Sequence, residues 1–248
     1  MKLKWIIGKK DTDKIKNLID KHSSNTFVQK RVSRNIKIKK ININKEVFWK
    51  EVICSLLTTQ QQSGAGSKPD KFYNKKPFPL SLKSCKVKEN NLYSFIEENI
   101  KGQGFRYENN KTKYIVENYN RLTSEKWELI VKLAKKLIEN RKKNPSSCNI
   151  NIEKEAAKYI NDSLIGFGPK QSRNLWQSLG LFRYEIPIDS RVTKWLNKHS
   201  IFPFNLTAGG LSDINYYQFI MEGIQKLCKE CDVLPCRLDA VIFVSYDK

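Results

Sequence analysis

Apolar and polar residues recur along most of this chain with the period of an amphipathic helix. From residue 46 onward the apolar positions fall three or four apart, as Phe48, Val52 and Leu56 illustrate. This period places them on one face of a helix. We expect helices from 46 to about 61, over 90–100, 112–122, 125–140 and 153–163, from 169 to Gly180, in a block reaching about 199, and finally over 214–231. The chain is therefore predicted to be mainly α-helical.

The first 45 residues carry the only strand signal. Ile36, Ile38, Ile41 and Ile43 partly alternate with Lys and Asn, which predicts a short strand or an extended arm. The same stretch holds 14 Lys and Arg against 3 Asp and Glu, a net charge of +11. Such a basic arm fits either direct contact with phosphates or a solvated surface, and the pattern leaves both interpretations open.

The net charge of the chain indicates which class of molecule it binds. The 248 residues include 46 Lys and Arg against 25 Asp and Glu, a net charge of +21. Folded proteins this basic commonly bind polyanions such as nucleic acid. The chain has no apolar run of 18 residues, and its first ten residues lack the pattern of a signal peptide. We therefore expect a cytoplasmic, nucleoid-associated protein or a nuclear one, with neither secretion nor membrane insertion.

The numbers and positions of the cysteines and histidines exclude further classes of protein. The six cysteines, at 54, 85, 148, 228, 231 and 236, are expected to be thiols of an intracellular protein rather than a disulfide framework. His22 and His199 are the only histidines, so a hydrolase with a His-rich metal centre is excluded.

A glycine-containing turn between two predicted helices is the most informative segment. Gly166 and Gly168 flank Phe167, and Pro169 then opens the next helix at the position that proline favours. Glycines let a backbone turn tightly and approach a ligand closely. Amides at a helix N-terminus attract anions, so the turn is a candidate phosphate site. An ordinary helix–helix turn would have the same residues.

The wider segment resembles the helix-hairpin-helix DNA glycosylase superfamily. Leu-Ile-Gly-Phe-Gly-Pro-Lys ends at Lys170, and Ile-Pro-Ile-Asp ends at Asp189, 19 residues later. Bifunctional members, among them 8-oxoguanine DNA glycosylase/lyases and endonuclease III, have a similar hairpin ending in Lys and a later Asp. Weaker matches are Ser55 to Gln60 and Gly102 to Arg106. The resemblance covers roughly 46–200 and implies a two-lobed helical fold.

The resemblance also implies roles for individual residues. Lys170 stands at the nucleophile position and Asp189 at the catalytic aspartate position. Gly166, Phe167 and Gly168 would bind DNA through the hairpin. Gln60 would fill the gap left by an extruded nucleotide, although a polar residue at a helix end is the plain alternative. Many members have His two residues after the aspartate, where this chain has Arg191, another expected DNA contact.

Four functional segments follow from the resemblance. Residues 1–45 form the basic arm, expected to pack with the C-terminal lobe, and 46–140 form the helical lobe with Gln60. The hairpin and catalytic aspartate occupy 151–200, and 201–248 form a C-terminal helical segment. In that last segment, Asp239 and Phe243 are candidates for lining a base pocket.

No metal or cofactor is predicted. Endonuclease III has a four-Cys iron–sulfur loop near its C-terminus, but the position of the first ligand is Met221 in this chain. Cys228, Cys231 and Cys236 have no nearby His to complete a zinc site, so we expect them to be core thiols.

The resemblance therefore implies a DNA glycosylase with abasic-site lyase activity that acts on double-stranded DNA with an oxidised base, as a monomer. The first candidate lesion is 8-oxoguanine. An oxidised pyrimidine is the alternative, and a non-enzymatic helix-hairpin-helix DNA-binding protein is the rival from another class, which would need neither Lys170 nor Asp189.

Overall fold

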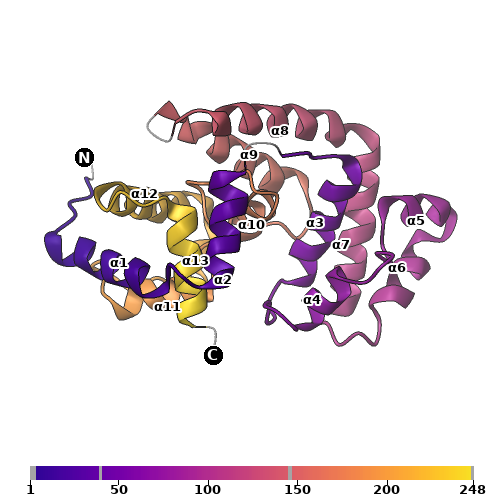
Figure 1. Ribbon diagram of the computed structural model, residues 1–248. Helices are drawn as coiled ribbons and strands as arrows, with labels where there is room; N and C mark the ends of the chain where they lie inside the picture. Colours follow the sequence, from indigo (N-terminus) through magenta and orange to yellow (C-terminus); the bar gives the residue numbers. More distant parts are fainter. Residues whose placement is uncertain (1–3, 39–40, 145–146, 247–248) are drawn as a thin grey trace. The chain divides into compact units, whose positions relative to one another are not determined.

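The computed structural model describes residues 4–38, 41–144 and 147–246 (Figure 1). These residues form thirteen α-helices and, within those ranges, no strand. The helices are α1 (Lys9–His22), α2 (Thr26–Val32), α3 (Lys45–Leu57), α4 (Lys68–Tyr73), α5 (Leu82–Val87), α6 (Leu92–Ile100), α7 (Glu108–Arg121), α8 (Trp127–Lys142), α9 (Ile150–Ser163), α10 (Pro169–Ser178), α11 (Ser190–Lys198), α12 (Ile214–Glu230) and α13 (Pro235–Ser245). The mainly α prediction is confirmed.

Of the two alternatives predicted for the alternating isoleucines, a short strand or an extended arm, the strand does not form within the described residues. The arm forms α1 and α2, and a π-helical turn over Ser33–Lys37 includes the first of the alternating isoleucines. Ile15 and Ile19, four residues apart, are buried and give α1 an apolar face. Ile38, Ile41 and Ile43 lie outside the helices and form no strand, and Ile38 has an extended backbone, as the alternative of an extended arm implied. Lys39 and Lys40 of that stretch lie outside the described residues.

The C-terminal segment contains a helix that the sequence did not predict. The predicted last helix corresponds to α12, but α13 follows it, starting at Pro235. Seven of the residues from Cys236 to Phe243 are buried, which leaves no polar face to reveal helical periodicity. Arg237 and Asp239 also interrupt the apolar positions, so a short segment that is buried on nearly every side is ambiguous from periodicity alone.

The chain forms two compact units. Unit 1 comprises residues 1–41, 137–158 and 168–248, and unit 2 comprises residues 42–136 and 159–167. Unit 1 therefore contains α10 to α13 together with α1 and α2, whereas unit 2 contains α3 to α7 and most of α8. Among the described helices, none is both long and apolar enough to cross a bilayer.

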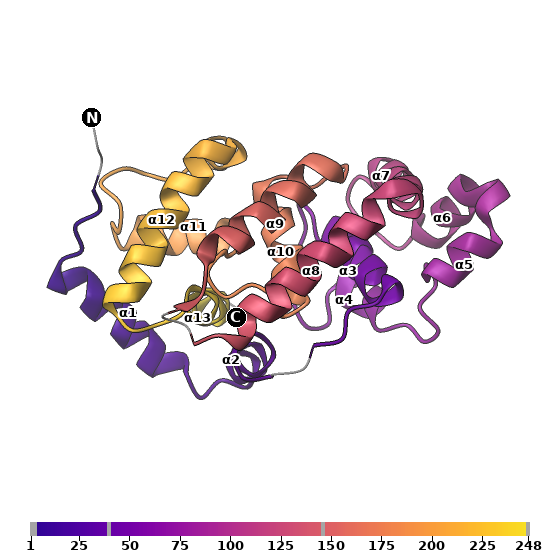
Figure 2. The same cartoon turned by 90° about the horizontal axis from the view of Figure 1, so that it is seen from above.

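Unit 1 is built around α13, whose apolar residues are buried. Helices α1, α2, α11 and α12 all pack against it, and α2 lies beside α13 in both views (Figures 1 and 2). The core also includes Ile186 and Ile188 from the loop that precedes α11. The loop that carries Asp189 is therefore anchored in the main core of unit 1.

Unit 2 packs α3 against α5 and α7, and α6 against α7. Trp49 of α3 is buried at its centre, edge-on to Tyr119 of α7 with ring centroids 5.8 Å apart. Its indole N–H donates to the carbonyl of Leu80 at 2.9 Å. The polar atom of this large side chain is therefore satisfied, as a buried Trp requires.

Candidate functional site

The glycine turn lies between α9 and α10. Gly166 has a φ of +81°, a conformation that glycine adopts without steric cost. A Cβ atom there would lie 2.8 Å from side-chain atoms of both Leu56 and Tyr114 within unit 2. Gly166 is therefore explained by the fold alone. The Phe167 side chain is buried, so any contact between Phe167 and a ligand would use its backbone.

Gly168 is different, because its φ of −86° suits any residue. A Cβ atom at this position would meet nothing within 4 Å. Gly168 is the residue before Pro169 and caps the N-terminus of α10, where the helix dipole favours an anion. The space beside it is therefore open at the end of α10 that would attract a phosphate.

Lys170 is the second residue of α10 and is partly buried. Burial lowers the pKa of its amine, because the charged form loses hydration, and the charge of Arg191 lowers that pKa further. The carboxylates of Asp189 and Asp239 oppose the change by stabilising the ammonium form. The net effect is a pKa below the ordinary value, which raises the fraction of free amine.

Asp189 caps the N-terminus of α11. Its Oδ1 atom accepts hydrogen bonds from the backbone N–H groups of Arg191 and Val192, at 2.8 and 3.0 Å. Its Oδ2 atom lies 3.7 Å from the Arg191 guanidinium. The cap fixes the orientation of the carboxylate and leaves it partly exposed, at 23%.

The loop that leads to Asp189 is held by a buried carboxylate. Glu153 of α9 accepts hydrogen bonds from three successive backbone N–H groups, those of Arg183, Tyr184 and Glu185, at 2.8–3.0 Å. Burial raises the pKa of Glu153 to about 7, although these hydrogen bonds lower it. Glu153 thus fixes the chain between Lys170 and Asp189.

A buried ion pair holds the start of α10. The Arg173 guanidinium contacts Glu185 at 2.6 Å and donates to the carbonyl of Pro169 at 2.9 Å. It also lies 4.3 Å from the centre of the Tyr217 ring. Because Pro169 precedes Lys170, this pair positions the first turn of the helix that carries the amine.

A second arginine links three elements of unit 1 near Lys170. Arg31 of α2 donates to Asp239 of α13 at 2.7 Å and to Gln177 of α10 at 2.9 Å. Asp239 is buried, and burial raises its pKa to about 6, although Arg31 acts to lower it. Gln177 lies seven residues after Lys170, so both lie on one face of α10.

Gln60 lies in unit 2, in the turn that follows α3. It is exposed and has a φ of +55°, an uncommon conformation for a residue other than glycine. The Arg106 guanidinium donates to its carbonyl at 3.1 Å, and the backbone N–H of Arg106 donates to Gln61 at 2.9 Å. Buried Lys111 donates to the carbonyl of Leu57 at 3.0 Å. These contacts hold the Gln60 turn.

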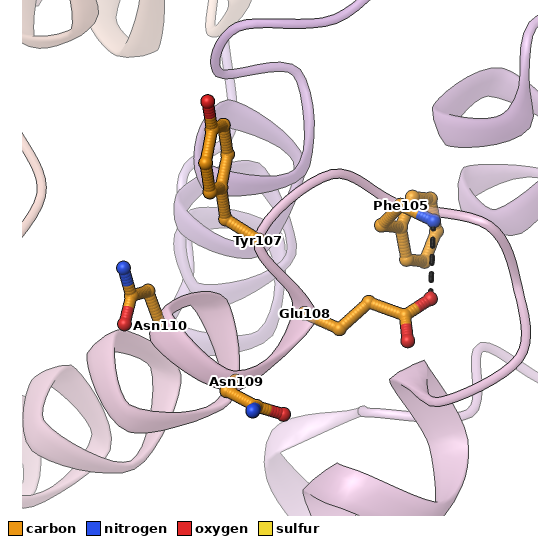
Figure 3. A pocket seen from close by; sticks show the side chains of 5 residues that line it. All are labelled: Phe105, Tyr107, Glu108, Asn109 and Asn110. Carbon is orange, nitrogen blue, oxygen red and sulfur yellow. Dashed lines mark hydrogen bonds between the residues drawn. The ribbon is translucent and has the colours of Figure 1, made fainter.

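A pocket of about 430 Å³ lies beside the loop that carries Arg106 (Figure 3). Glu108 reaches back across this loop, and its Oε1 atom accepts from the backbone N–H groups of Gly104 and Phe105, both at 3.2 Å. Tyr107 stands apart from Glu108 and is 60% exposed. The lining residues are Phe105, Tyr107, Glu108, Asn109 and Asn110.

The C-terminal cysteines are buried thiols. Cys228, Cys231 and Cys236 all lie in the core of unit 1. Burial raises the pKa of each thiol, which favours the protonated form over the thiolate that binds metals. Across the described ranges, His, Cys, Asp and Glu form no group of three or more arranged to hold a metal ion.

The structure thus divides the candidate residues between the units. Lys170, Asp189 and Arg191 lie together in unit 1, within electrostatic reach of one another. Gln60, Gly166 and Phe167 belong to unit 2. Sequence reasoning missed the supporting residues Arg31, Glu153, Arg173 and Tyr217, whose contacts join positions distant in the chain. The functional roles of the candidate residues, and the division of the chain into four segments, stay predictions.

Comparison with known proteins supports the fold. No protein-family model matches the chain, and no curated protein does. Three solved structures match. The 8-oxoguanine DNA glycosylase of Methanocaldococcus jannaschii has a TM-score of 0.63 at 17% identity, covering 96% of this chain and 94% of that one. The 8-oxoguanine glycosylase/lyase of the same organism, in complex with a 15mer DNA containing 8-oxoguanine, has a TM-score of 0.61 at 16% identity, covering 95% and 98%.

The third match is the 8-oxoguanine DNA glycosylase of Thermotoga maritima, with a TM-score of 0.60 at 12% identity and 95% of each chain covered. Each similarity extends over nearly the whole chain, including the N-terminal helices and α13 that the sequence did not predict. The chain therefore has the fold of the helix-hairpin-helix DNA glycosylases, as the resemblance of its hairpin implied.

Proposed function

We propose that this protein is a DNA glycosylase with abasic-site lyase activity that removes an oxidised base from double-stranded DNA. The observation that carries the proposal is the position of Lys170. A partly buried amine with a lowered pKa follows the glycine turn of a glycosylase fold and lies near Asp189. A lysine placed to bind phosphate as a cation would have no use for a lowered pKa.

The chemistry requires a free amine. The Lys170 Nζ lone pair would attack C1′ of the deoxyribose as the bond from C1′ to the base breaks, and the base would leave with the bonding electrons and take up a proton. Opening of the sugar ring would give an imine between Nζ and C1′. Loss of a 2′ proton would then expel the 3′ phosphate, and water would hydrolyse the imine to release Lys170.

Asp189 has two supporting roles in this scheme. Its carboxylate would stabilise the positive charge that develops on the sugar as the base departs. It would also accept the proton that Lys170 must lose before attack. The cap that Asp189 forms on α11 fixes its orientation, so the group is held in place before substrate binds.

The hairpin and the Gln60 turn would supply the contacts with DNA. A base within a duplex is inaccessible, so its nucleotide must be turned out into the protein. The open space beside Gly168 suits a DNA phosphate at the N-terminus of α10. The exposed Gln60 side chain would occupy the place of the extruded nucleotide and bond to the base left behind.

The first candidate lesion is 8-oxoguanine. The solved structures that match this chain are 8-oxoguanine glycosylases, and one of them is bound to DNA containing that base. An oxidised pyrimidine remains the alternative substrate, because endonuclease III shares the hairpin pattern that ends in Lys. The choice depends on the residues that contact the flipped base.

Borohydride trapping tests the proposal. Borohydride reduces an imine to a stable amine, so a covalent protein–DNA adduct forms only if an imine does. The wild-type protein should form this adduct and cut duplexes containing 8-oxoguanine faster than duplexes containing an oxidised pyrimidine or no lesion. Lys170→Gln should abolish trapping while changing affinity for DNA by only a few fold.

Lys229→Gln provides a matched control, because Lys229 is an exposed lysine at the end of α12. This variant should trap DNA as the wild type does. Undiminished trapping by Lys170→Gln would rule out the assignment of the nucleophile. If the wild type bound duplex DNA but neither trapped any of the lesions nor released a base from them, the protein would instead be a non-enzymatic DNA-binding protein.

A further inference from the structure

Arg191 makes two contacts that a phosphate-binding arginine would not need. The carbon atom of its guanidinium lies 4.0 Å from the centre of the Phe243 ring. One of its nitrogen atoms lies 3.7 Å from Oδ2 of Asp189. A planar guanidinium binds well to an aromatic face and can still interact with a carboxylate at its edge. The Arg191 side chain is therefore already engaged by two contacts within unit 1.

The Phe243 ring is itself held in place. It stacks on Phe27 of α2, with ring centroids 4.6 Å apart and an angle of 13° between the planes. Phe243 is 8% exposed and lies on α13, the central helix of unit 1. The stack of Phe27, Phe243 and Arg191 thus joins α2, α13 and α11. The Arg191 guanidinium of this stack lies beside Asp189.

Each of the two carboxylates near Lys170 has its own arginine. Arg31 binds Asp239 at 2.7 Å, and Arg191 lies beside Asp189. The Arg31 pair is buried more deeply, and Arg31 also bonds to Gln177. Because Arg31 is committed to Asp239, Arg191 is the cation placed to orient Asp189.

We propose that Arg191 is a positioning residue rather than a phosphate ligand: held on the Phe243 ring, its guanidinium orients the outer oxygen of Asp189 and keeps a positive charge beside the Lys170 amine. The catalytic consequences rest on the proposed function. Many proteins whose hairpin this chain resembles have His at the position of Arg191.

Removing the Arg191 charge should raise the pKa of Lys170. Burial and the charge of Arg191 lower the pKa of Lys170, whereas Asp189 on α11 and Asp239 on α13 raise it. Arg31 offsets the charge of Asp239. Without the Arg191 charge, both carboxylates would stabilise the ammonium form more strongly, so the pKa of Lys170 would rise. Less free amine would then be present at neutral pH.

The test compares Arg191→Gln, Arg191→Lys and Phe243→Leu with the wild type. The rate of borohydride trapping in a single turnover is measured from pH 5.5 to 9.5, where its acidic limb follows the ionisation of the amine. Arg191→Gln should move the midpoint upward by roughly 0.5–1 pH unit. Arg191→Lys should move it less, because the charge remains, but should slow trapping several fold, since an ammonium cannot stack flat on Phe243.

Phe243→Leu keeps the Arg191 charge and removes the ring that holds it. This variant should move the midpoint in the same direction as Arg191→Gln, by a smaller amount. Urea unfolding of each variant shows whether it is folded, and the Arg191 variants decide the matter if the buried Leu substitution prevents folding. An unchanged midpoint in Arg191→Gln would overturn the proposal.

The alternative role makes a different prediction. If Arg191 is a phosphate ligand, Arg191→Gln should weaken binding to undamaged duplex and reduce the slope of log K against log salt by about one unit. That outcome, with the midpoint unchanged, would also overturn the proposal. Binding within two fold of the wild type, together with the shifted midpoint, would support it.

The proposed function and the role of Arg191 can fail separately. Reductive methylation with ¹³C-formaldehyde labels the lysines, and the Lys170 signal is identified by its absence from Lys170→Gln. Titration of that signal gives the pKa of Lys170 without any reaction on DNA. A higher pKa in Arg191→Gln, in a protein that traps no DNA, would support this inference and refute the proposed function. An equal pKa of Lys170 in Arg191→Gln and the wild type, in a protein that does trap DNA, would refute this inference and support the proposed function.

Discussion

The hydroxyl of Tyr217 accepts a hydrogen bond from the backbone N–H of Ile188 at 2.6 Å, and Ile188 immediately precedes Asp189. The same hydroxyl donates to the carbonyl of Ile186 at 2.9 Å. Burial raises the pKa of Tyr217 well above its ordinary value, so the hydroxyl stays protonated and can donate one hydrogen bond while it accepts the other. One side chain of α12 thus fixes the backbone on which the orientation of Asp189 depends.

Tyr217→Phe should therefore affect both stability and activity. It leaves a buried N–H and a buried C=O without partners, at a cost of about 1–3 kcal/mol in the free energy of unfolding. A less rigid loop should also slow single-turnover base excision about 10-fold or more. Urea unfolding and excision assays measure the two effects. Tyr216→Phe alters the neighbouring, partly exposed residue and should change neither.

Two substitutions at Asp189 separate its roles as helix cap and as charged group. Asparagine caps helices about as well as aspartate, so Asp189→Asn should stay within about 0.5 kcal/mol of the wild type in unfolding free energy. Its turnover should nevertheless fall by about 10²–10⁴, the range typical of a positioned charged group. Asp189→Ala should lose activity and about 1 kcal/mol of stability as well. Normal turnover by Asp189→Asn would show that the charge is not needed.

The two glycines of the hairpin should respond differently to alanine. Gly166→Ala forces a left-handed residue and brings Cβ to 2.8 Å from Leu56 and Tyr114, so it should destabilise the protein by about 1–3 kcal/mol. Gly168→Ala places a methyl group in open space at an ordinary φ, so stability should barely change. Its methyl group would lie in the path of a phosphate, so affinity for DNA should fall. Equal affinity of Gly168→Ala and wild type would argue against phosphate contact at this turn.

Local signals account for the parts of the fold that the sequence predicted. Pro169 at the start of α10 and Gly180 after its end are the punctuation that helices favour, and Asp189 is a preferred cap. Helices α1 and α13 lacked such clear patterns. Ile15 and Ile19 give α1 an apolar face, but lysines surround it, whereas α13 is buried on nearly every side and has two charged residues among its apolar ones.

The supporting contacts of the site could not be predicted from one sequence. Arg31 and Asp239 are 208 residues apart, and their ion pair exists only because α2 packs against α13. Glu153 resembles any glutamate on a helix until its carboxylate meets three backbone N–H groups from a distant loop. Motifs identify the reactive residues because their chemistry requires particular side chains. Packing decides which other residues surround them.

Glu153 should make the stability of the protein depend on pH. Burial raises its pKa to about 7 in the folded protein, above the 4.5 of a glutamate in water. The folded state therefore binds the proton more tightly, so this stabilising contribution is complete below pH 4.5 and is lost as pH rises through 7. Relative to Glu153→Gln, which cannot titrate, the wild type should lose about 3 kcal/mol over this range.

Urea unfolding from pH 5 to 8 measures most of this change. The free energy of unfolding of the wild type minus that of Glu153→Gln should fall steadily across the series. Glu155→Gln is the matched control, because Glu155 is exposed on the same helix and should give a flat difference. A flat difference for Glu153→Gln as well would mean that the buried carboxylate is already ionised at pH 5.

The basic N-terminal segment should contribute to DNA affinity without affecting catalysis. Each neutralised phosphate releases about 0.9 of a counterion, so contacts with phosphates give a steep decrease of affinity with salt. Replacing Lys37, Lys39 and Lys40 with Ser should reduce the slope of log K against log salt by up to about three units, while turnover on saturating DNA is unchanged. The control variant replaces three exposed lysines of α8 with Ser, namely Lys132, Lys135 and Lys136. It removes the same net charge from another surface. Equal slopes for the arm variant and the wild type would assign the arm to a solvated surface and leave DNA binding to the hairpin and the helices around it.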